Sequence, residues 1–282
     1  MAFASGKRNL KIAVLVRNFV TCGGMERYAV EIARRLRERG HEIHLFCREK
    51  DERLVAGMIV HRVPLRWEFS SALGSLGFAR DCAGLLKGET YDIIHSHERG
   101  YSQDVLTVHT FSYKGSLCRY PLLRRFDQTW LSDRGWVYLW LEARQMQTRR
   151  LVAVSENIRE DIRKHYHRLS GVDIIEPGVD ADLFNPDRIP AERDSLRTKF
   201  SVADTETVVL FVGSEFKRKG LDRLIPAIGP GMRLLVVGRG ENLPFYQNLA
   251  VQHGVVWQVD FVGLVEDDVG RYYAAADVVV LP

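Results

Sequence analysis

Short hydrophobic runs alternate along the chain with segments in which apolar residues recur every three or four positions. Such runs are typical of parallel strands that are buried on both faces, and the longer spacing is typical of helices with one buried face. The alternation predicts an α/β fold with doubly wound parallel sheets. The expected strands are 11–16, 43–47, 58–63, 92–95, 105–108, 151–154 and 172–175, and then 208–212, 233–237, 259–262 and 278–281.

The first expected helix illustrates the pattern. From Met25 onward, apolar side chains fall on one face and arginines on the other, and Gly40 ends the segment. Glycines weaken the prediction of a second helix at 70–87. The remaining expected helices are 157–167, 218–227, 243–253 and 267–276.

A stretch rich in proline and turn residues separates the two blocks of strands and helices. Such composition is typical of a domain boundary. We therefore predict an N-terminal domain at 1–175, a hinge and linker at 176–205, and a C-terminal domain at 206–282. The chain stops at Pro282, at the tip of an expected buried strand, which favours a second domain that is incomplete and a chain that is the front portion of a longer protein.

Composition limits the class of protein. Among 282 residues, 46% are hydrophobic and 27% are charged, which excludes a disordered or fibrous chain. The net charge of +4 suits anionic substrates or an anionic membrane surface and does not require nucleic acid. The four cysteines lack paired spacing, so we expect free thiols in a reducing compartment. No apolar stretch reaches membrane-spanning length, and we expect a soluble or peripheral cytoplasmic protein.

The strongest candidate chemistry follows the expected strand at 208–212. A Gly213-Ser214 turn leads into the cationic triplet 217–219 and then Gly220. Fixed cations next to a helix start suit phosphate oxygens, and the stretch is interpreted as a diphosphate clamp. The simpler alternative is a solvated basic loop.

Three histidines lie at or just after strand ends: His95, His97 and His109. A histidine there can contact a sugar hydroxyl, act as a general base or bind a metal. Their spacing does not favour zinc. For His95 a structural role is favoured, and for His109 both a substrate contact and a structural role stay open.

Residues 111–150 interleave tryptophan and tyrosine with arginine and lysine. This composition suits a lipid headgroup layer or lipid-linked acceptor. It also suits an internal helix pair with aromatic core residues, and less well a surface for single-stranded nucleic acid. We expect no nucleic-acid partner.

Four pieces occur in a characteristic order: 23–27 (Gly-Gly-Met-Glu-Arg), 107–110 (Thr-Val-His-Thr), 177–180 (Pro-Gly-Val-Asp), and the loop 213–220 with the later 237–240. Together they resemble the retaining glycosyltransferases of family 4, which have the two-domain GT-B architecture. Within that family, GSEFKRKGLDR and the aromatic-basic section are similar to the lipopolysaccharide core glucosyltransferase I group.

The resemblance implies two Rossmann-like domains facing a cleft. It implies transfer of a hexose, with UDP-glucose as the expected donor, to a lipopolysaccharide-core or other lipid-linked acceptor at the inner face of the cytoplasmic membrane, without metal or cofactor. The family's Glu-x7-Glu signature would fall beyond Pro282, so this stretch alone is expected to be nearly inactive. Ser214 departs from the arginine of many relatives.

Carried over by motif, the resemblance assigns roles to individual residues. The alternatives to a glycosyltransferase are a GT-B nucleotide-sugar 2-epimerase and a non-catalytic module that binds nucleotide or membrane. The expected catalytic residues are His109, Arg218 and Lys219; the donor-binding residues are Gly23, Gly24, Gly213, Ser214, Arg218, Lys219 and Gly238; the acceptor-binding residues are Glu98, Arg99, Phe111 and Lys114.

Overall fold

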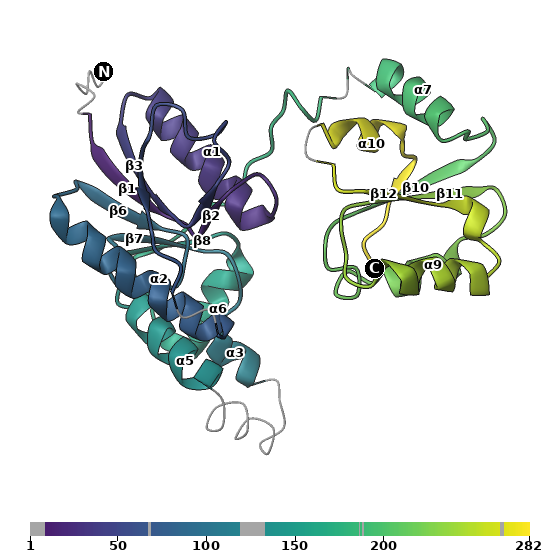
Figure 1. The fold of residues 1–282 in the computed structure, drawn as a ribbon. Coiled ribbons are helices and arrows are strands. Elements are labelled where there is room, and N and C mark those ends of the chain that lie inside the picture. Colours follow the sequence, from purple (N-terminus) through teal and green to yellow (C-terminus); the bar gives the residue numbers. More distant parts are fainter. Residues whose placement is uncertain (1–8, 67–68, 119–132, 186, 188, 266–267) are drawn as a thin grey trace. The chain divides into compact units, whose positions relative to one another are not determined.

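The computed structural model describes residues 9–66, 69–118, 133–185, 187, 189–265 and 268–282. Its contacts divide the chain into two compact units, Met1–Pro177 and Gly178–Pro282 (Figure 1). Each unit is an α/β layer structure with its own hydrophobic core. Within the described residues, no helix is both long and apolar enough to cross a bilayer.

The first unit is built on a seven-stranded sheet in which every neighbouring pair is parallel, with the order β5-β3-β1-β6-β7-β8-β9. The chain winds from β1 out to the β5 edge and then returns to the other side of β1. The strands are β1 (Lys11–Leu15), β3 (Glu42–Cys47), β5 (Ile59–Arg62), β6 (Ile93–Ser96), β7 (Val105–Val108), β8 (Arg150–Ala153) and β9 (Val172–Ile174), with a small separate pair β2 (Asn18–Phe19) and β4 (Glu49–Lys50).

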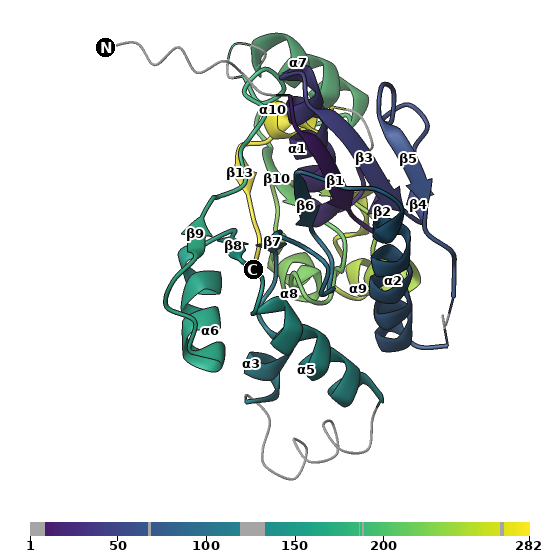
Figure 2. The same cartoon turned by 90° about the vertical axis from the view of Figure 1, so that its left-hand side faces the viewer.

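Helices cover both faces of this sheet because consecutive strand residues point to opposite sides. Ile12 and Val14 of β1 belong to the core cluster with residues of α1, whereas Ala13 and Leu15 belong to the cluster with Phe78 of α2. Figures 1 and 2 show the two helices beside the sheet. The helices are α1 (Gly24–Glu38), α2 (Ser71–Leu85), α3 (Tyr113–Leu117), α5 (Asp133–Gln145) and α6 (Glu156–Tyr166), with a 3-10 turn, η1 (Leu86–Gly88).

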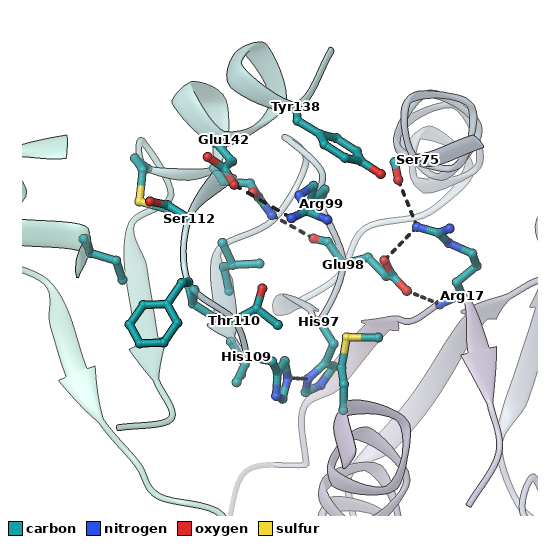
Figure 3. Close-up of a pocket in the computed structure, with 18 of the residues that line it drawn as sticks. Arg17, Ser75, His97, Glu98, Arg99, His109, Thr110, Ser112, Tyr138 and Glu142 are labelled. Carbon is teal, nitrogen blue, oxygen red and sulfur yellow. Dashed lines mark hydrogen bonds and ion pairs between the residues drawn. The ribbon is translucent and has the colours of Figure 1, made fainter. Parts of the chain in front are cut away.

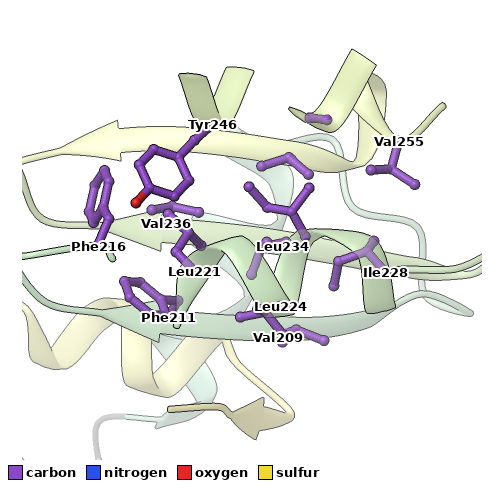
Figure 4. Close-up of a cluster of buried hydrophobic side chains, with 13 residues drawn as sticks. Val209, Phe211, Phe216, Leu221, Leu224, Ile228, Leu234, Val236, Tyr246 and Val255 are labelled. Carbon is purple, nitrogen blue, oxygen red and sulfur yellow. The ribbon is translucent and has the colours of Figure 1, made fainter. Parts of the chain in front are cut away.

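The second unit repeats the design with four parallel strands in the order β12-β11-β10-β13. Alternate residues of β10 and β11 meet α8 and α9 on one face, in the cluster that Figure 4 shows. The other face packs against α7 and α10. The elements are α7 (Ile189–Lys199), β10 (Thr207–Val212), α8 (Leu221–Leu224), η3 (Ile225–Ala227), β11 (Met232–Val237), α9 (Leu243–Gln252), η4 (Val256–Gln258), β12 (Val259–Gly263), α10 (Gly270–Ala275) and β13 (Val278–Val279).

The predicted α/β class with parallel sheets is confirmed, but two element predictions are wrong. The helix expected at 218–227 is reduced to the four residues of α8, because Gly220 enters with a left-handed φ of 75° and Pro226 lacks an N–H. Part of the stretch expected to be a linker, 176–205, is instead helix α7, since Leu196 is buried against the sheet and Arg193 pairs with Asp277.

The aromatic-basic section is described only in part, because residues 119–132, with Tyr120, Phe126 and Trp130, lie outside the described residues. Helix α5 buries Tyr138 and Leu141 in the first unit, whereas Trp136 and Trp140 are 52% and 44% exposed. The described part therefore contains both core aromatics and surface aromatics. All four cysteines are free thiols, as predicted.

Candidate active site

A cavity of about 330 Å³ lies in the first unit at the carboxyl ends of β1, β6 and β7 (Figure 3). The strand order reverses beside β1, and the loops that leave neighbouring strands there diverge and leave room for a ligand. The cavity is lined by Arg17 after β1, by His97 to Arg99 after β6, and by His109 to Ser112 after β7. Its position is the usual ligand crevice of an open α/β sheet.

Glu98 forms one wall of this cavity together with Arg17. The Glu98 carboxylate accepts hydrogen bonds from the Arg17 backbone N–H at 3.2 Å and from its guanidinium at 3.1 Å. The same guanidinium also donates to Ser75 Oγ of α2 at 3.1 Å. Sequence reasoning missed Arg17, and the available signal was that it is the first polar residue after the opening strand.

The three strand-end histidines are brought together beside the cavity. His95 Nε2 lies 2.8 Å from Thr107 Oγ1, and His97 Nδ1 lies 3.2 Å from His109 Nε2. Burial lowers the pKa of His95 and of His109 to about 4, with a further contribution to His109 from His95. Burial also lowers the pKa of His97. All three rings are uncharged at neutral pH. Only His97 and His109 among them line the cavity, where a neutral ring can exchange hydrogen bonds with a ligand hydroxyl, and His95 is taken up by Thr107.

The zinc alternative for these histidines is not supported by their arrangement. In the described part of the chain, the one group of three or more metal-ligand atoms that lie close together is His44, His61 and Glu89. None of those residues lines the cavity.

A buried carboxylate holds the loop that leaves β7. Glu142 of α5, with a side chain 4% exposed, accepts hydrogen bonds from the backbone N–H groups of Tyr113 at 2.6 Å and Lys114 at 3.2 Å, and from the Tyr166 hydroxyl at 2.6 Å. Arg99 lies 3.8 Å from the same carboxylate. Burial and Glu142 raise the pKa of Tyr166. Sequence reasoning missed this anchor entirely.

A second carboxylate, Asp161 of α6, accepts from the Ser112 backbone N–H at 2.8 Å. The Ser112 hydroxyl in turn accepts from Gly115 N–H at 2.9 Å and caps α3. The loop that carries His109 and Phe111 is therefore held by two carboxylates, Asp161 and Glu142, where it enters α3.

The predicted acceptor residues separate into two groups. Glu98, Arg99 and Phe111 line the cavity. Lys114 does not: its ammonium donates to the His165 carbonyl at 2.7 Å and lies 5.0 Å from the centre of the Tyr166 ring. Its side chain is taken up by a structural contact.

The glycine pair at 23–24 opens α1, with Gly23 as the N-cap and Gly24 as the first helical residue, and the next two residues, Met25 and Glu26, line the cavity. Gly23 has a φ of 111°, and a Cβ there would lie 2.3 Å from a carboxylate oxygen of Glu26. A side chain at Gly24 would meet nothing within 4 Å. Glycine is therefore required at Gly23 by its backbone conformation, and no contact within the structure requires it at Gly24.

The second unit places a cation at the carboxyl end of β10. The Lys219 ammonium lies 3.4 Å from the Val212 carbonyl oxygen and directly over Gly213, where a Cβ would be 2.0 Å from it. A Cβ on Gly238, at the end of β11, would lie 2.2 Å from the Gly213 oxygen. The turns that follow β10 and β11 thus touch through their glycines. Burial lowers the pKa of Lys219, and the neighbouring charge of Arg218 lowers it further.

Arg218 and Lys219 have different contacts. Its guanidinium pairs with Glu215 at 2.6 Å, its side chain is 68% exposed, and it lines a separate cavity of about 610 Å³ with Phe216 and Tyr246. Ser214 is exposed. Because α8 has only four residues, the expected contribution of a helix dipole to anion binding is small here.

The family model Glycosyltransferase Family 4 matches residues 22–183, more than half of the chain, and the model Glycosyl transferases group 1 matches 192–282.

The chain belongs to glycosyltransferase family 4.

Curated relatives of this family 4 chain include a D-inositol 3-phosphate glycosyltransferase of Mycobacterium ulcerans, 25% identical over 92% of this chain. The lipopolysaccharide glucosyltransferase WaaG of Escherichia coli K12 is 23% identical, with coverage of 96% of this chain and 74% of WaaG. The chain spans 61% of the length of the M. ulcerans relative.

Solved structures agree on the fold. A crystal structure of WaaG has a TM-score of 0.85 at 24% identity, with 96% of this chain and 74% of WaaG covered. Anabaena HepE in complex with UDP and glucose has a TM-score of 0.72 at 20% identity, with 96% and 73% covered. These likenesses confirm the predicted fold class, that of the GT-B glycosyltransferases.

Proposed function

We propose that the protein transfers a hexose from a nucleotide-diphosphate sugar, with UDP-glucose as the donor, to a lipopolysaccharide-core or other lipid-linked glycan. Transfer would retain the anomeric configuration and need no metal. Membership of family 4 supports the reaction class. The name of the E. coli relative, a lipopolysaccharide glucosyltransferase, supports the acceptor class, and the HepE structure with UDP and glucose supports the donor.

The observation that carries the proposal is the half-buried ammonium of Lys219 over Gly213. When a sugar leaves its nucleotide, negative charge builds on the departing diphosphate. A fixed cation in a partly desolvated position stabilises that charge more than one in water does. Backbone at Gly213, Ser214 and Gly238 would approach the phosphates, and Arg218 would exchange Glu215 for a phosphate oxygen.

The first unit would bind the sugars. His109, uncharged at neutral pH, would hydrogen-bond a hydroxyl of the transferred hexose, and Glu98, Arg99 and Phe111 would contact the acceptor. Gly23 and Gly24 would let backbone amides at the start of α1 approach the donor. The roles of His109, Glu98, Arg99 and Phe111 rest on the cavity that they line, whereas the role of the two glycines rests on their place at the start of α1.

We further propose that the protein acts as a peripheral protein at the cytoplasmic face of the membrane. Trp136 and Trp140 of α5 are partly exposed, and the Arg144 guanidinium lies 5.4 Å from the centre of a Trp140 ring. An aromatic ring with a neighbouring cation suits an anionic headgroup layer.

Donor binding tests the central claim. We expect calorimetric titration with UDP to give saturable binding that is tighter than binding of GDP. Lys219→Met should weaken it roughly 10- to 100-fold, the size expected for loss of one charge-assisted hydrogen bond. The matched control Lys217→Met removes an adjacent exposed cation and should change affinity less than about threefold. Equal affinities for wild type and Lys219→Met would refute the diphosphate role.

Product analysis separates transfer from the alternatives. Incubation of the full-length protein with UDP-glucose should release UDP only when a lipid-linked glycan is present as the acceptor. Conversion of UDP-glucose to an epimer without acceptor would favour a 2-epimerase. Membrane binding that persists without any affinity for UDP would favour a non-catalytic module.

A further inference from the structure

A second polar cluster of the first unit lies on β3, on the edge strand β5 and on the turn before β6. It consists of His44, His61 and Glu89, and their ligand atoms lie within 4.8 Å of one another. His44 Nδ1 is 2.8 Å from His61 Nε2 and 3.9 Å from a carboxylate oxygen of Glu89. His44 is buried, His61 is half-buried and Glu89 is exposed, so the cluster opens to solvent on one side.

Glu42 orients the central imidazole. Its carboxylate oxygen lies 2.6 Å from His44 Nε2. A carboxylate only accepts, so Nε2 carries the proton and Nδ1 of the neutral ring keeps its lone pair. That lone pair points at His61. Metal-binding histidines commonly donate their other N–H to a carboxylate, which fixes the tautomer and makes the ligand more basic.

The ring geometry is close to that of two ligands of one ion. Two nitrogens bound to a tetrahedral zinc ion at about 2.0–2.1 Å lie roughly 3.3 Å apart. The present separation of 2.8 Å is a hydrogen bond, so the rings need to part by about half an ångström. An ion would take the place of the proton that His61 Nε2 now donates to His44 Nδ1, and His61 would carry its proton on Nδ1 instead.

From this arrangement we propose that the first unit binds a zinc ion through His44 Nδ1, His61 Nε2 and the Glu89 carboxylate, with water in the fourth position. Two imidazoles and a carboxylate form a donor set that zinc favours in proteins. The site is separate from the proposed transfer reaction, because none of its residues lines the cavity at the carboxyl ends of the strands.

The bound ion would fasten the edge of the sheet. Among the described strands, β5 pairs with β3 alone, at one edge of the sheet (Figure 2). Glu89 belongs to the turn that leads into β6. One ion would therefore join three segments that are distant in sequence. Because an edge strand opens more easily than a central one, we expect the amides of β5 to gain protection from hydrogen exchange.

Lys11 provides a contrasting prediction. Its ammonium forms an ion pair with Glu89 and lies 3.9 Å from Glu42. Zinc must displace this lysine from Glu89, so Lys11 competes with the metal. Lys11→Gln should therefore tighten zinc binding, whereas removal of a ligand should weaken it.

The experiment uses tag-free, chelator-treated protein titrated with Zn²⁺ in a calorimeter, and with Co²⁺ while visible absorption reports its coordination. We expect one saturable site per chain and a rise in the thermal midpoint with Zn²⁺. His61→Gln should lose at least tenfold in affinity and Glu42→Gln about tenfold, the usual effect of a residue that orients a metal ligand. His253→Gln, at the exposed end of α9, is the matched histidine control and should bind like the wild type.

Half-buried His61 is preferred to buried His44 so that the variant keeps its fold, which circular dichroism checks. Glu89→Gln, on the exposed side, provides a second variant and should also weaken binding. Absence of saturable Zn²⁺ binding would overturn the proposal, and so would equal affinities for wild type, His61→Gln and Glu89→Gln.

Discussion

Two strand-end loops of this protein are held in place by opposite means. The segment after β7, residues 109–117, is held by the buried carboxylate of Glu142 and the half-buried carboxylate of Asp161, which accept its backbone N–H groups. The loop after β10, residues 213–219, depends on missing side chains, because its turn touches the next one through Gly213 and Gly238. The first loop should respond to charge and pH, and the second mainly to side-chain size.

The largest expected effect comes from Gly238→Ala in the second loop. The new Cβ would lie 2.2 Å from the Gly213 oxygen, and the φ of 132° is one that residues with a side chain rarely adopt. We expect the second unit to lose more than about 4 kcal/mol of unfolding free energy. Hydrogen exchange at the amides of β10 and β11 measures this loss.

Gly229→Ala is the matched control for that variant, since a Cβ there meets nothing within 4 Å. Its effect should stay within about 1 kcal/mol. Similar losses for Gly229→Ala and Gly238→Ala would show that the contact between the two turns does not hold the loop.

Acid should weaken the first unit more than the second. The pKa of His95 and of His109 is about 4 in the folded protein and about 6.5 in an unfolded chain. The unfolded chain therefore binds more protons between these values. The stabilisation is complete above pH 6.5 and is lost as the pH falls toward 4, at up to about 3 kcal/mol per histidine.

Urea unfolding of the first unit at pH 7 and at pH 4.5 tests this dependence. His109→Gln should reduce the difference in unfolding free energy between pH 7 and pH 4.5, because the variant lacks one histidine whose pKa is lowered by folding. The second unit, whose one histidine is exposed His253, serves as the internal comparison. An unchanged pH dependence in His109→Gln would contradict the assignment.

Glu142→Gln should destabilise the segment after β7, because it removes the negative charge and one acceptor oxygen while it keeps the size of the side chain. The amide keeps the size of the carboxylate but can accept with only one oxygen, so Tyr113 N–H or the Tyr166 hydroxyl loses its acceptor. We expect a loss of about 2 kcal/mol in the first unit. Chemical denaturation measures this loss. The control is exposed Glu160→Gln, which removes only a surface ion pair with Arg163 and should cost much less.

The smallest expected effect is that of Lys114→Met. The ammonium donates to the His165 carbonyl outside the cavity, and methionine keeps most of its apolar contact with Tyr166. Acceptor affinity should change less than about twofold and stability by under roughly 1 kcal/mol. A tenfold loss of acceptor binding, measured by product formation at limiting acceptor, would show that Lys114 does contact the acceptor.

Much of the site could be located from sequence. The run at 208–212, the turn at Gly213, and the strand-end positions of His95, His97 and His109 all follow from local pattern. Arg17 could not be paired with Glu98, because the two are 81 positions apart and no spacing rule links them. The same holds for Glu142 and the amides of 113–114.

The sequence by itself determined the α/β class and the position of most strands, because the burial of a strand or helix face is written into residues that are close neighbours in the chain. It also determined the family, through short motifs in a fixed order. Only the tertiary structure decided that Lys219 covers Gly213 while Arg218 pairs with Glu215, that three histidines lose their charge together, and that His44 faces His61. Those outcomes depend on desolvation and on contacts between distant segments, which exist only once the chain is packed.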